Sequence, residues 1–199
     1  LGLYGQTVQA TGQYSEATTW SLDNWGQYLV ACSPADGKLW EWQRGTGSDA
    51  AVIANAPTNC LGLVVTENRF IFALGADGDP RKISWCDFED NTLWAAASTN
   101  QAGDITLQSA GQIMAGVRTA GQTLILTHQE CYRSTYVGPP FLPPFDRVSF
   151  ASGLHARKAM ADTPTRRFLV RGVGFFTSQG PLVSVHKSEA HTKGLNTNK

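Results

Sequence analysis

WSLDNWGQYLVACSPADGKLWEWQ, residues 20–43, contains two apolar segments joined by a turn sequence. Between them, Asp36-Gly37 supplies a dipeptide that is typical of two-residue β-hairpins. Side chains alternate along a strand, so Trp40 and Trp42 share one face of the second segment. We therefore predict a β-hairpin here, and we expect the paired tryptophans to bury the face that they share.

The same arrangement occurs four times along the chain. In each copy, three apolar residues are followed, after a turn, by an aromatic residue in a second apolar or alternating segment. The apolar runs are Leu29-Val30-Ala31, Phe70-Ile71-Phe72, Leu124-Ile125-Leu126 and Phe168-Leu169-Val170, beginning 41, 54 and 44 residues apart. Strand–turn–strand units repeated at roughly 40 to 50 residues indicate propeller blades. We predict an all-β fold of β-propeller-like blades of antiparallel strands, and the uneven spacing favours a partial or irregular propeller.

Composition divides the chain into three parts. We predict a Gly/Gln/Thr-rich arm at residues 1–19, the propeller-like β domain at residues 20–185 and a polar tail at residues 186–199. Within the domain, Glu67-Asn68 and Gly121-Gln122 are expected to form hairpin turns. The sequence has no initiator Met and opens inside a glycine-tyrosine stretch, so we expect it to be part of a longer protein.

Charge and cysteine usage exclude several classes of protein. Sixteen basic and sixteen acidic residues cancel, so no net field steers the whole chain onto nucleic acid or lipid. Basic residues predominate from Arg147 onward, as either a solvated edge and tail or a basic face near a polyanion. No apolar run approaches 18 residues, so we predict no membrane span. The four cysteines contain no C-x-x-C pair, and we predict buried free thiols.

Patterns that would indicate catalysis or metal binding are weak, and we predict no enzyme, cofactor or metal site. The pair Asp77 and Asp79 has the spacing of a calcium loop but favours a turn, since no later ligands follow. Another acidic cluster, Asp87, Glu89 and Asp90, could supply paired carboxylates for glycoside hydrolysis, but a solvated loop is favoured. For His128 and Cys131, no third group is evident that would orient a catalytic dyad.

Part of the chain, from Trp20 to Phe176, resembles a family of short-tailed bacteriophage virion proteins: tail hub, adaptor and packaged-DNA-stabilisation proteins with propeller-like folds. Three segments carry the resemblance. They are residues 19–26 with 29–31 and 37–42, residues 65–75 with 79–81 and 83–87, and Thr135-Tyr136-Val137-Gly138-Pro139-Pro140-Phe141 leading to Gly153-Leu154. After Phe176 the resemblance is lost in the polar tail, which implies a partial copy.

The resemblance implies a structural role in the virion tail, below the portal, in which the protein helps retain and conduct packaged DNA. Its partners would be other tail, portal and adaptor proteins, further copies of itself in a ring, and double-stranded DNA by non-specific contact. The protein would be made in the host cytoplasm and reside in the virion. Candidate residues facing a DNA lumen are Arg166, Arg167 and Arg171. Candidate inter-subunit loop residues are Gly138, Pro139, Pro140, Phe141, Pro143 and Pro144, in a stretch whose prolines exclude a central strand or a helix.

Two other functions stay open at the level of sequence. The six tryptophans could stack on sugars in a carbohydrate-binding propeller used for host recognition, although packing between blades requires repeated aromatics at corresponding positions and is favoured. A glycoside hydrolase fragment that uses the cluster around Asp87 is the second alternative.

Overall fold

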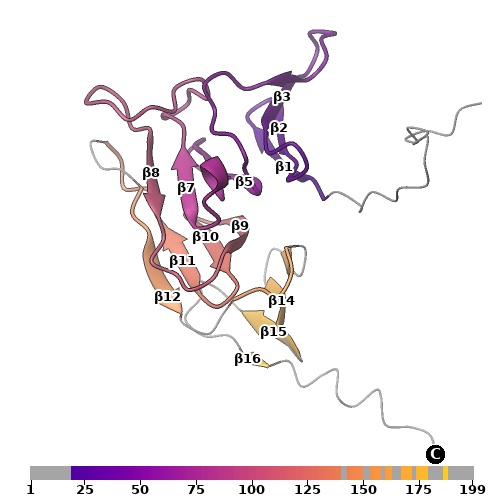
Figure 1. The fold of residues 1–199 in the computed structure, drawn as a ribbon, viewed down its shortest axis with the longest axis vertical. Coiled ribbons are helices and arrows are strands. Elements are labelled where there is room, and N and C mark those ends of the chain that lie inside the picture. Colours follow the sequence, from indigo (N-terminus) through magenta and orange to yellow (C-terminus); the bar gives the residue numbers. More distant parts are fainter. Residues whose placement is uncertain are drawn as a thin grey trace, which may run out of the picture.

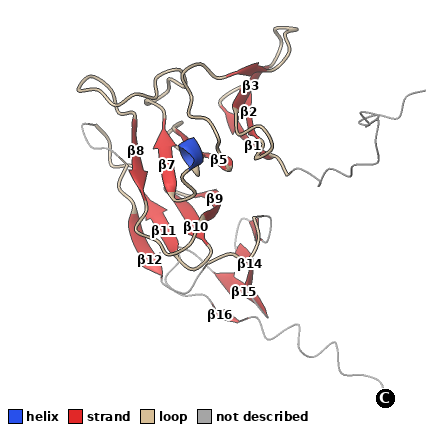
Figure 2. Ribbon diagram, in the orientation of Figure 1, coloured by secondary structure: helices blue, strands red, loops and turns tan. Residues whose placement is uncertain are grey.

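The computed structural model describes residues 19–139, 143–149, 153–157, 160–162, 167–171, 174–178 and 186–187. Its strands form four antiparallel sheets of four strands each, in chain order (Figures 1 and 2). The first sheet contains β1 (Ser21–Trp25), β2 (Tyr28–Cys32), β3 (Leu39–Gln43) and β4 (Ala51–Val52). The second contains β5 (Gly62–Val65), β6 (Ile71–Leu74), β7 (Lys82–Trp85) and β8 (Gly103–Thr106). The third contains β9 (Ile113–Thr119), β10 (Gln122–Thr127), β11 (Cys131–Ser134) and β12 (Asp146–Ser149), and the fourth contains β13 (Met160–Asp162), β14 (Arg167–Arg171), β15 (Gly174–Ser178) and β16 (His186–Lys187).

The sheets follow one another in an arc, which Figure 1 shows from β1–β3 through β5 and β7 to β9–β12 and then β14–β16. The first strands of neighbouring sheets lie together, β1 against β5 and β5 against β9. Four-stranded meanders placed side by side in this way are propeller blades. The predicted all-β, partial propeller is confirmed.

Helical structure is confined to one short 3₁₀ turn, η1 (Ala76–Gly78), within the described ranges. No helix in that part of the chain has the length and apolar character of a membrane span.

The repeat seen in the sequence corresponds to the two central strands of each sheet. The apolar runs fall in β2, β6, β10 and β14, except that Phe70 immediately precedes β6, and the aromatic that follows each run falls in β3, β7, β11 or β15. Central strands have neighbours on both edges and can be covered on both faces, so they tolerate continuous apolar runs. The second sheet shows this fully, because all four residues of β6 are buried.

Alternate residues of these central strands pack against different neighbouring sheets, and this packing holds the sheets side by side in a row. We call the face of a sheet that points toward the next sheet in chain order its forward face, and the opposite face its backward face. Val30 and Cys32 lie on the forward face of β2, in a cluster that also contains Ile71 and Ala73 from the backward face of β6. The other two residues of β6, Phe72 and Leu74, face forward into a second cluster that contains Ile125 and Tyr132 of the third sheet. One sheet therefore contributes a different set of side chains to each of its two neighbours.

A third cluster covers the forward face of the third sheet. It contains Met114, Leu124, Leu126 and Cys131, and is completed by Leu154, which is fully buried. The Leu154 N–H donates to the carbonyl of Thr127 at 2.8 Å. Gly153 lies so close to the His128 backbone that a Cβ atom would stand 2.0 Å from the His128 carbonyl oxygen. Only glycine fits there, which gives the Gly153-Leu154 pair a structural reason.

Polar side chains of β1 join the first strands of two sheets. β5 is the edge strand of the second sheet, so its outer N–H and C=O groups have no strand partner. The Ser21 hydroxyl donates to the Leu63 carbonyl at 2.8 Å, and Asp23 Oδ2 accepts the Val65 N–H at 2.8 Å. Asp23 also pairs with Arg118 of β9, at 3.5 Å. One carboxylate thus contacts the first strands of both following blades.

Tryptophan and arginine strengthen the same junction. Trp25 Nε1 donates to the Arg69 carbonyl at 2.8 Å, and the Arg69 guanidinium lies 4.8 Å from the Trp25 ring centroid. Arg69 itself has a φ of 62°, so it is held in the left-handed region at the end of the β5–β6 turn. That turn, Thr66 to Arg69, contains the predicted Glu67-Asn68, and this prediction is confirmed.

Other local predictions differ in position from the turns and strands that the structure shows. β2 and β3 are joined by residues 33–38 rather than by a two-residue Asp36-Gly37 turn, and Gly37 N–H donates to the Ser33 carbonyl inside that longer loop. Gln122 pairs with Thr119, so the β9–β10 turn is Ala120-Gly121, one residue before the predicted position. A further hairpin at Gly26-Gln27, between β1 and β2, was not predicted. The segment predicted as the polar tail begins with strand β16, which pairs with β15.

Asp23→Ala should destabilise the protein by about 1–3 kcal/mol, because the Val65 N–H loses its acceptor at a buried position. Asp23→Asn keeps an acceptor and should cost less. Asp49→Ala, in an exposed loop, is the control and should change the free energy of unfolding by less than about 0.5 kcal/mol. Urea unfolding measures all three, and equal effects of Asp23→Ala and Asp49→Ala would contradict the proposed junction.

Gly116→Ala tests the close approach of β9 to β5. A Cβ atom there would lie 2.4 Å from Val64 Cγ1, so the two sheets must separate, at a cost of about 1–3 kcal/mol. Gly62→Ala is the matched control on β5, where the nearest atoms lie 3.7 Å away. This second variant should be neutral or more stable by about 0.5 kcal/mol. Thermal unfolding of the two variants and the wild type measures these differences in stability. A Gly116→Ala protein as stable as the wild type would show that β9 and β5 are not in contact.

Candidate assembly surface

The backward face of the first sheet is apolar and only partly buried. Leu29 pairs with Trp42, and Ala31 with Trp40, across β2 and β3. Together with Trp20 and Ala50 these residues line a hollow of about 260 Å³. Trp42 is 43% exposed and Trp20 47%. The expected burial of the Trp40–Trp42 face is therefore wrong for the described structure, because no described sheet packs against it.

Equivalent positions in the next two sheets are buried. Ile71 and Ala73 occupy them in the second sheet, where the first sheet covers them. Ile125 and Tyr132 occupy them in the third sheet, where the second sheet covers them. The Trp40–Trp42 face thus has the composition of a blade-to-blade interface, and none of the described sheets covers it.

The tryptophans on this face are not equally positioned. The Trp40 indole N–H donates to Asp36 Oδ2 at 2.9 Å, which fixes the ring at one end of the hollow. At the other end, Leu29 and Trp42 also border a polar depression that is lined by Asn24, Gly26, Gln27 and Arg44. An apolar centre with a polar rim is the usual composition of a protein–protein interface.

The other three tryptophans are core residues, as packing between blades predicts. Trp25 and Trp94 belong to the cluster between the first and second sheets, and Trp85 to the cluster between the second and third. Each is less than a tenth exposed. Their indole N–H groups donate to the backbone carbonyls of Arg69, Asn91 and Gln101 respectively.

A second hollow, of about 180 Å³, lies where the first strands of the first three sheets meet. Arg157 borders it and donates to the carbonyls of Leu61 and Ile113, both at 3.4 Å. Burial lowers the pKa of this guanidinium from its usual value. In the sequence Arg157 is only one of many basic residues, since nothing nearby marks it as a cation that lies between sheets.

The predicted lumen arginines fall at the margin of what the structure describes. Arg167 and Arg171 are the first and last residues of β14, and only their backbone is described. Arg166 lies outside the described residues. Their place in a DNA lumen stays a prediction.

The proline-rich stretch connects β11 to β12 and forms neither helix nor strand where it is described. Pro140 and Phe141 lie outside the described residues; Pro139 and Pro144 are exposed, Gly138 is half-buried and Pro143 is buried. Aromatics at both ends of this connection hold it against the second sheet. Tyr136 packs on Phe70, with ring centroids 5.0 Å apart, and Phe145 packs on Phe72 and Trp85 at 5.4 and 5.5 Å.

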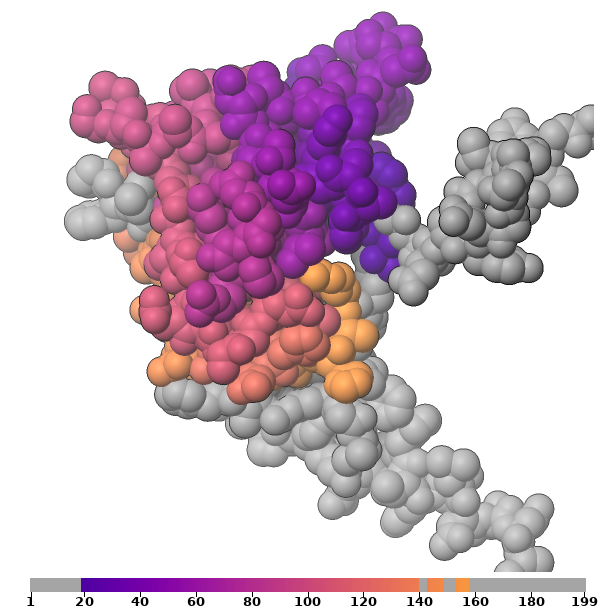
Figure 3. Space-filling model, viewed as in Figure 1, coloured from indigo at the N-terminus to yellow at the C-terminus, as the bar shows by residue number. Residues whose placement is uncertain are grey.

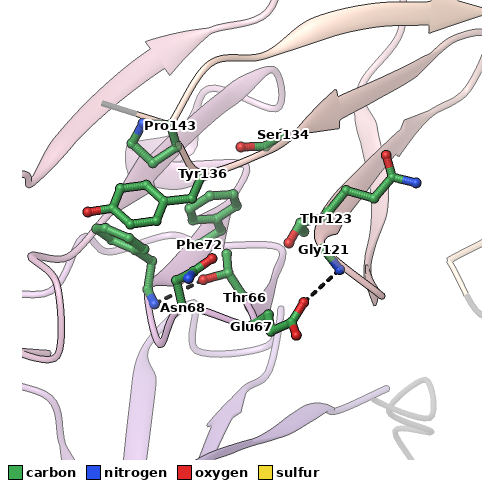
Figure 4. Close-up of a pocket in the computed structure, with 11 residues that line it drawn as sticks. Thr66, Glu67, Asn68, Phe72, Gly121, Thr123, Ser134, Tyr136 and Pro143 are labelled. Carbon is green, nitrogen blue, oxygen red and sulfur yellow. Dashed lines mark hydrogen bonds between the residues drawn. The ribbon is translucent and has the colours of Figure 1, made fainter. Parts of the chain in front are cut away.

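Figure 4 shows the junction beneath this connection, where the β5–β6 turn meets the third sheet. Glu67 Oε2 accepts the Gly121 N–H at 2.6 Å, which ties one hairpin turn to the next. The space left among Phe72, Tyr136 and Pro143 is only about 10 Å³, room for one water molecule. The junction is a joint between blades and has no room for a larger ligand.

The acidic residues considered for catalysis support turns. Asp87 Oδ1 accepts the backbone N–H groups of Phe88 and Gln101, both at 2.8 Å. Asp90 accepts the Thr92 hydroxyl and N–H, and these bonds hold the pKa of Asp90 below its usual value. A glycosidase acid needs a raised pKa instead. Glu89 pairs with Arg69 at 3.5 Å.

Asp77 and Asp79 likewise serve the loop around η1. Asp77 forms an ion pair with Lys82 at 2.9 Å, and Asp79 Oδ1 accepts the Arg81 N–H at 2.9 Å. In the ranges that the structure covers, no group of three or more metal-binding side chains occurs.

The cysteines and His128 occupy different environments. All four cysteines are buried and free of disulfide bonds, as predicted. Burial raises the pKa of the Cys32, Cys60 and Cys86 thiols to about 12. His128 is exposed and its ring contacts the Gln112 amide at 3.2 Å, whereas Cys131 lies in the third cluster.

Among the described residues, Glu130 is the one buried carboxylate. It connects the outer strand of the third sheet, β12, to the other strands of that sheet. It accepts the Tyr132 hydroxyl at 3.0 Å and Arg147 Nη1 at 3.0 Å. Burial alone would raise the pKa of Glu130. The hydrogen bonds from Ser109 and Tyr132 and the positive charge of Arg147 outweigh burial, so the pKa lies below its usual value.

No protein-family model and no curated protein sequence matches the chain. Among solved structures, the chain is similar to the N-terminal domain of Nup159, with a TM-score of 0.44 and 9% sequence identity. The match covers 82% of this chain and 45% of the Nup159 chain, so this chain spans less than half of that structure.

The hydrogen bonds and the ion pair of Glu130 predict that the free energy of unfolding depends on pH. Because the folded pKa is below the unfolded value of about 4.5, the ionised network stabilises the protein above that pH and the stabilisation is lost as pH falls through the folded pKa. Glu130→Gln should lower the free energy of unfolding by about 1–3 kcal/mol at pH 7. The difference from wild type should shrink below about pH 4.5 in urea titrations. A difference that stays constant from pH 7 to pH 3 would show that folding does not lower the pKa of Glu130.

Proposed function

We propose that this protein is a structural subunit of a bacteriophage tail, located below the portal, where it helps retain and conduct packaged DNA. The observation that carries the proposal is the exposed apolar face of the first sheet. A row of propeller blades that ends on a face of this composition is suited to packing against another protein surface. Assembly is therefore the activity that the geometry supports best.

The segments that resemble phage tail proteins form the framework of this row. Residues 19–42 supply β1–β3, and residues 65–87 supply the β5–β6 turn, β6 and β7. The third segment supplies the connection after β11 and the Gly153-Leu154 pair that closes the third cluster. The resemblance thus rests on residues with identifiable packing roles, which supports a shared architecture.

Contact with DNA is the least constrained part of the proposal. Duplex that slides through a tail requires charge without base-reading groups. The sequence supplies the arginines for such a surface around β14, at residues 166, 167 and 171. We therefore place DNA contact on the fourth sheet and assembly on the first.

A carbohydrate-binding role is the second candidate, because Trp20 and Trp42 expose indole rings on an open face. Sugar sites combine such rings with polar groups that hydrogen-bond the hydroxyls. The hollow lined by Leu29, Ala31, Trp40 and Trp42 is apolar almost throughout, so its chemistry favours a protein surface over a sugar.

Mass spectrometry of purified virions tests the structural role. In particles of the phage that encodes this chain, the protein should be present in several copies and should remain with isolated tails. An amber codon at Trp42 should give particles that lose packaged DNA, and suppression of that codon by tryptophan should restore them. Absence of the protein from intact virions would overturn the proposal.

Glycan-array binding distinguishes the second candidate. The assembly role predicts no saturable binding, and any weak signal should be the same for wild type and Trp42→Ala. Saturable binding that Trp42→Ala abolishes, and that Trp85→Phe in the core leaves intact, would favour the carbohydrate-binding role instead.

A further inference from the structure

Arg157 is a half-buried cation that has no anionic partner among the described residues. Its guanidinium takes part in none of the ion pairs within the described ranges. The ionisable group that acts on it is the Cys32 thiol, and burial raises the pKa of that thiol to about 12, so the thiol is neutral at pH 7. A charge that is removed from water without a counter-charge destabilises the folded state, and an anion that reached the guanidinium would offset this cost.

The guanidinium also has N–H donors that no described residue uses. Nη1 donates to the carbonyls of Leu61 and Ile113, both at 3.4 Å, which is longer than an ordinary N–H···O bond. The Nε and Nη2 donors have no hydrogen-bond partner among the described residues. Together they form one planar edge of the guanidinium, the edge that binds a carboxylate through two parallel hydrogen bonds.

The hollow beside Arg157 offers a space for such an anion. Its volume of about 180 Å³ leaves room for several water molecules, whereas the junction below the proline-rich connection has room for one. The walls combine polar residues, Thr19 and Ser21, with the apolar side chains of Leu61, Leu74 and Met114. A concave space with apolar walls and few polar groups is the usual form of a small-molecule site. This hollow is too small for a DNA duplex.

The fold holds Arg157 at the edge of this hollow. Three residues earlier, the buried Leu154 donates its N–H to the Thr127 carbonyl at 2.8 Å. Figure 3 shows orange atoms of the segment after β11 against violet atoms of the second sheet, as the bond from Arg157 to the Leu61 carbonyl requires. A guanidinium that is anchored before any anion arrives loses little conformational freedom on binding.

We propose that this hollow binds a small organic monocarboxylate, which accepts hydrogen bonds from Nε and Nη2 of Arg157 and places its apolar part against Leu74 and Met114. The carboxylate supplies the negative charge that the described residues do not, and its planar shape matches the free edge of the guanidinium. Inorganic phosphate also carries negative charge, but it has no apolar part to place against the walls. The inference goes beyond the proposed tail role and does not depend on it.

Titration of the full 199-residue chain with benzoate tests the site. Benzoate should bind with a dissociation constant of about 1 mM, the order expected for so small a molecule. In proton–nitrogen correlation NMR, at constant ionic strength with chloride as the replaced anion, the amide signals of Gly62 and Gly116 should shift and saturate, because both residues line the hollow. The signals of Gly45 and Gly47, in an exposed loop, should not move.

Variants of the arginine separate the roles of charge and shape. Arg157→Met removes the charge and the donors, and should weaken benzoate binding by about 10-fold or more. Arg157→Lys keeps the charge but loses the planar edge, and should weaken binding by about 3-fold to 10-fold. Arg133→Met is the matched control, since Arg133 lies on β11, pairs with Asp146 at 3.9 Å and does not border the hollow. This control should bind benzoate as the wild type does.

Three results would overturn the proposal. Benzoate that leaves the Gly62 and Gly116 signals unchanged would show that the hollow takes no carboxylate. Equal binding by Arg157→Met and wild type would remove Arg157 from the site; if Arg157→Met does not fold, as judged by circular dichroism, equal binding by Arg157→Lys is the contradicting result. Inorganic phosphate that binds as tightly as benzoate would contradict the class of molecule, because the apolar walls would then contribute nothing.

Discussion

The row of sheets depends on how the unpaired backbone N–H and C=O groups of the edge strand β5 find hydrogen-bond partners. An edge strand leaves alternate N–H and C=O groups without partners, and such groups are costly when they are buried. Ser21 and Asp23 of β1 are spaced two residues apart, as are Leu63 and Val65 of β5, so the two side chains meet the backbone groups of β5 in register. This match sets the position of the first blade against the second, and Asp23 extends it to Arg118 of the third.

With the first strands fixed, the central strands fill the space between the sheets. Because alternate residues point to opposite faces, a continuous apolar run can serve two interfaces at once. Phe72 and Ile71 are adjacent in sequence yet belong to different clusters. The same geometry explains the first sheet, whose forward residues are buried while Leu29, Trp40 and Trp42 face away from the second sheet. The assembly surface is thus a consequence of how blades are made.

The third sheet shows how a connecting segment helps to cover the face of a blade. Leu154 comes back from the connection that follows β12 and completes the third cluster, and Gly153 lets it approach the His128 backbone. The aromatic anchors Tyr136 and Phe145 fasten the proline-rich connection to the second sheet in the same way. Segments that the sequence suggests as outward loops are therefore partly structural, and this leaves the first sheet as the more suitable surface for a partner.

The amino-acid sequence was enough to predict the fold class and the central strands of every blade, because strands that are covered on both faces need apolar runs and these recur visibly. It also determined the buried thiols and the turn at Glu67-Asn68. It could not reveal β1, β4, β8 or β12, since these edge strands carry polar residues whose partners lie in other segments. Nor could it show that Trp25 and Trp85 are core residues while Trp42 is exposed, or that Arg157 lies between sheets. Those distinctions depend on which face a neighbouring sheet covers, and only the tertiary structure decides this, because coverage is a property of segments that are distant in the chain.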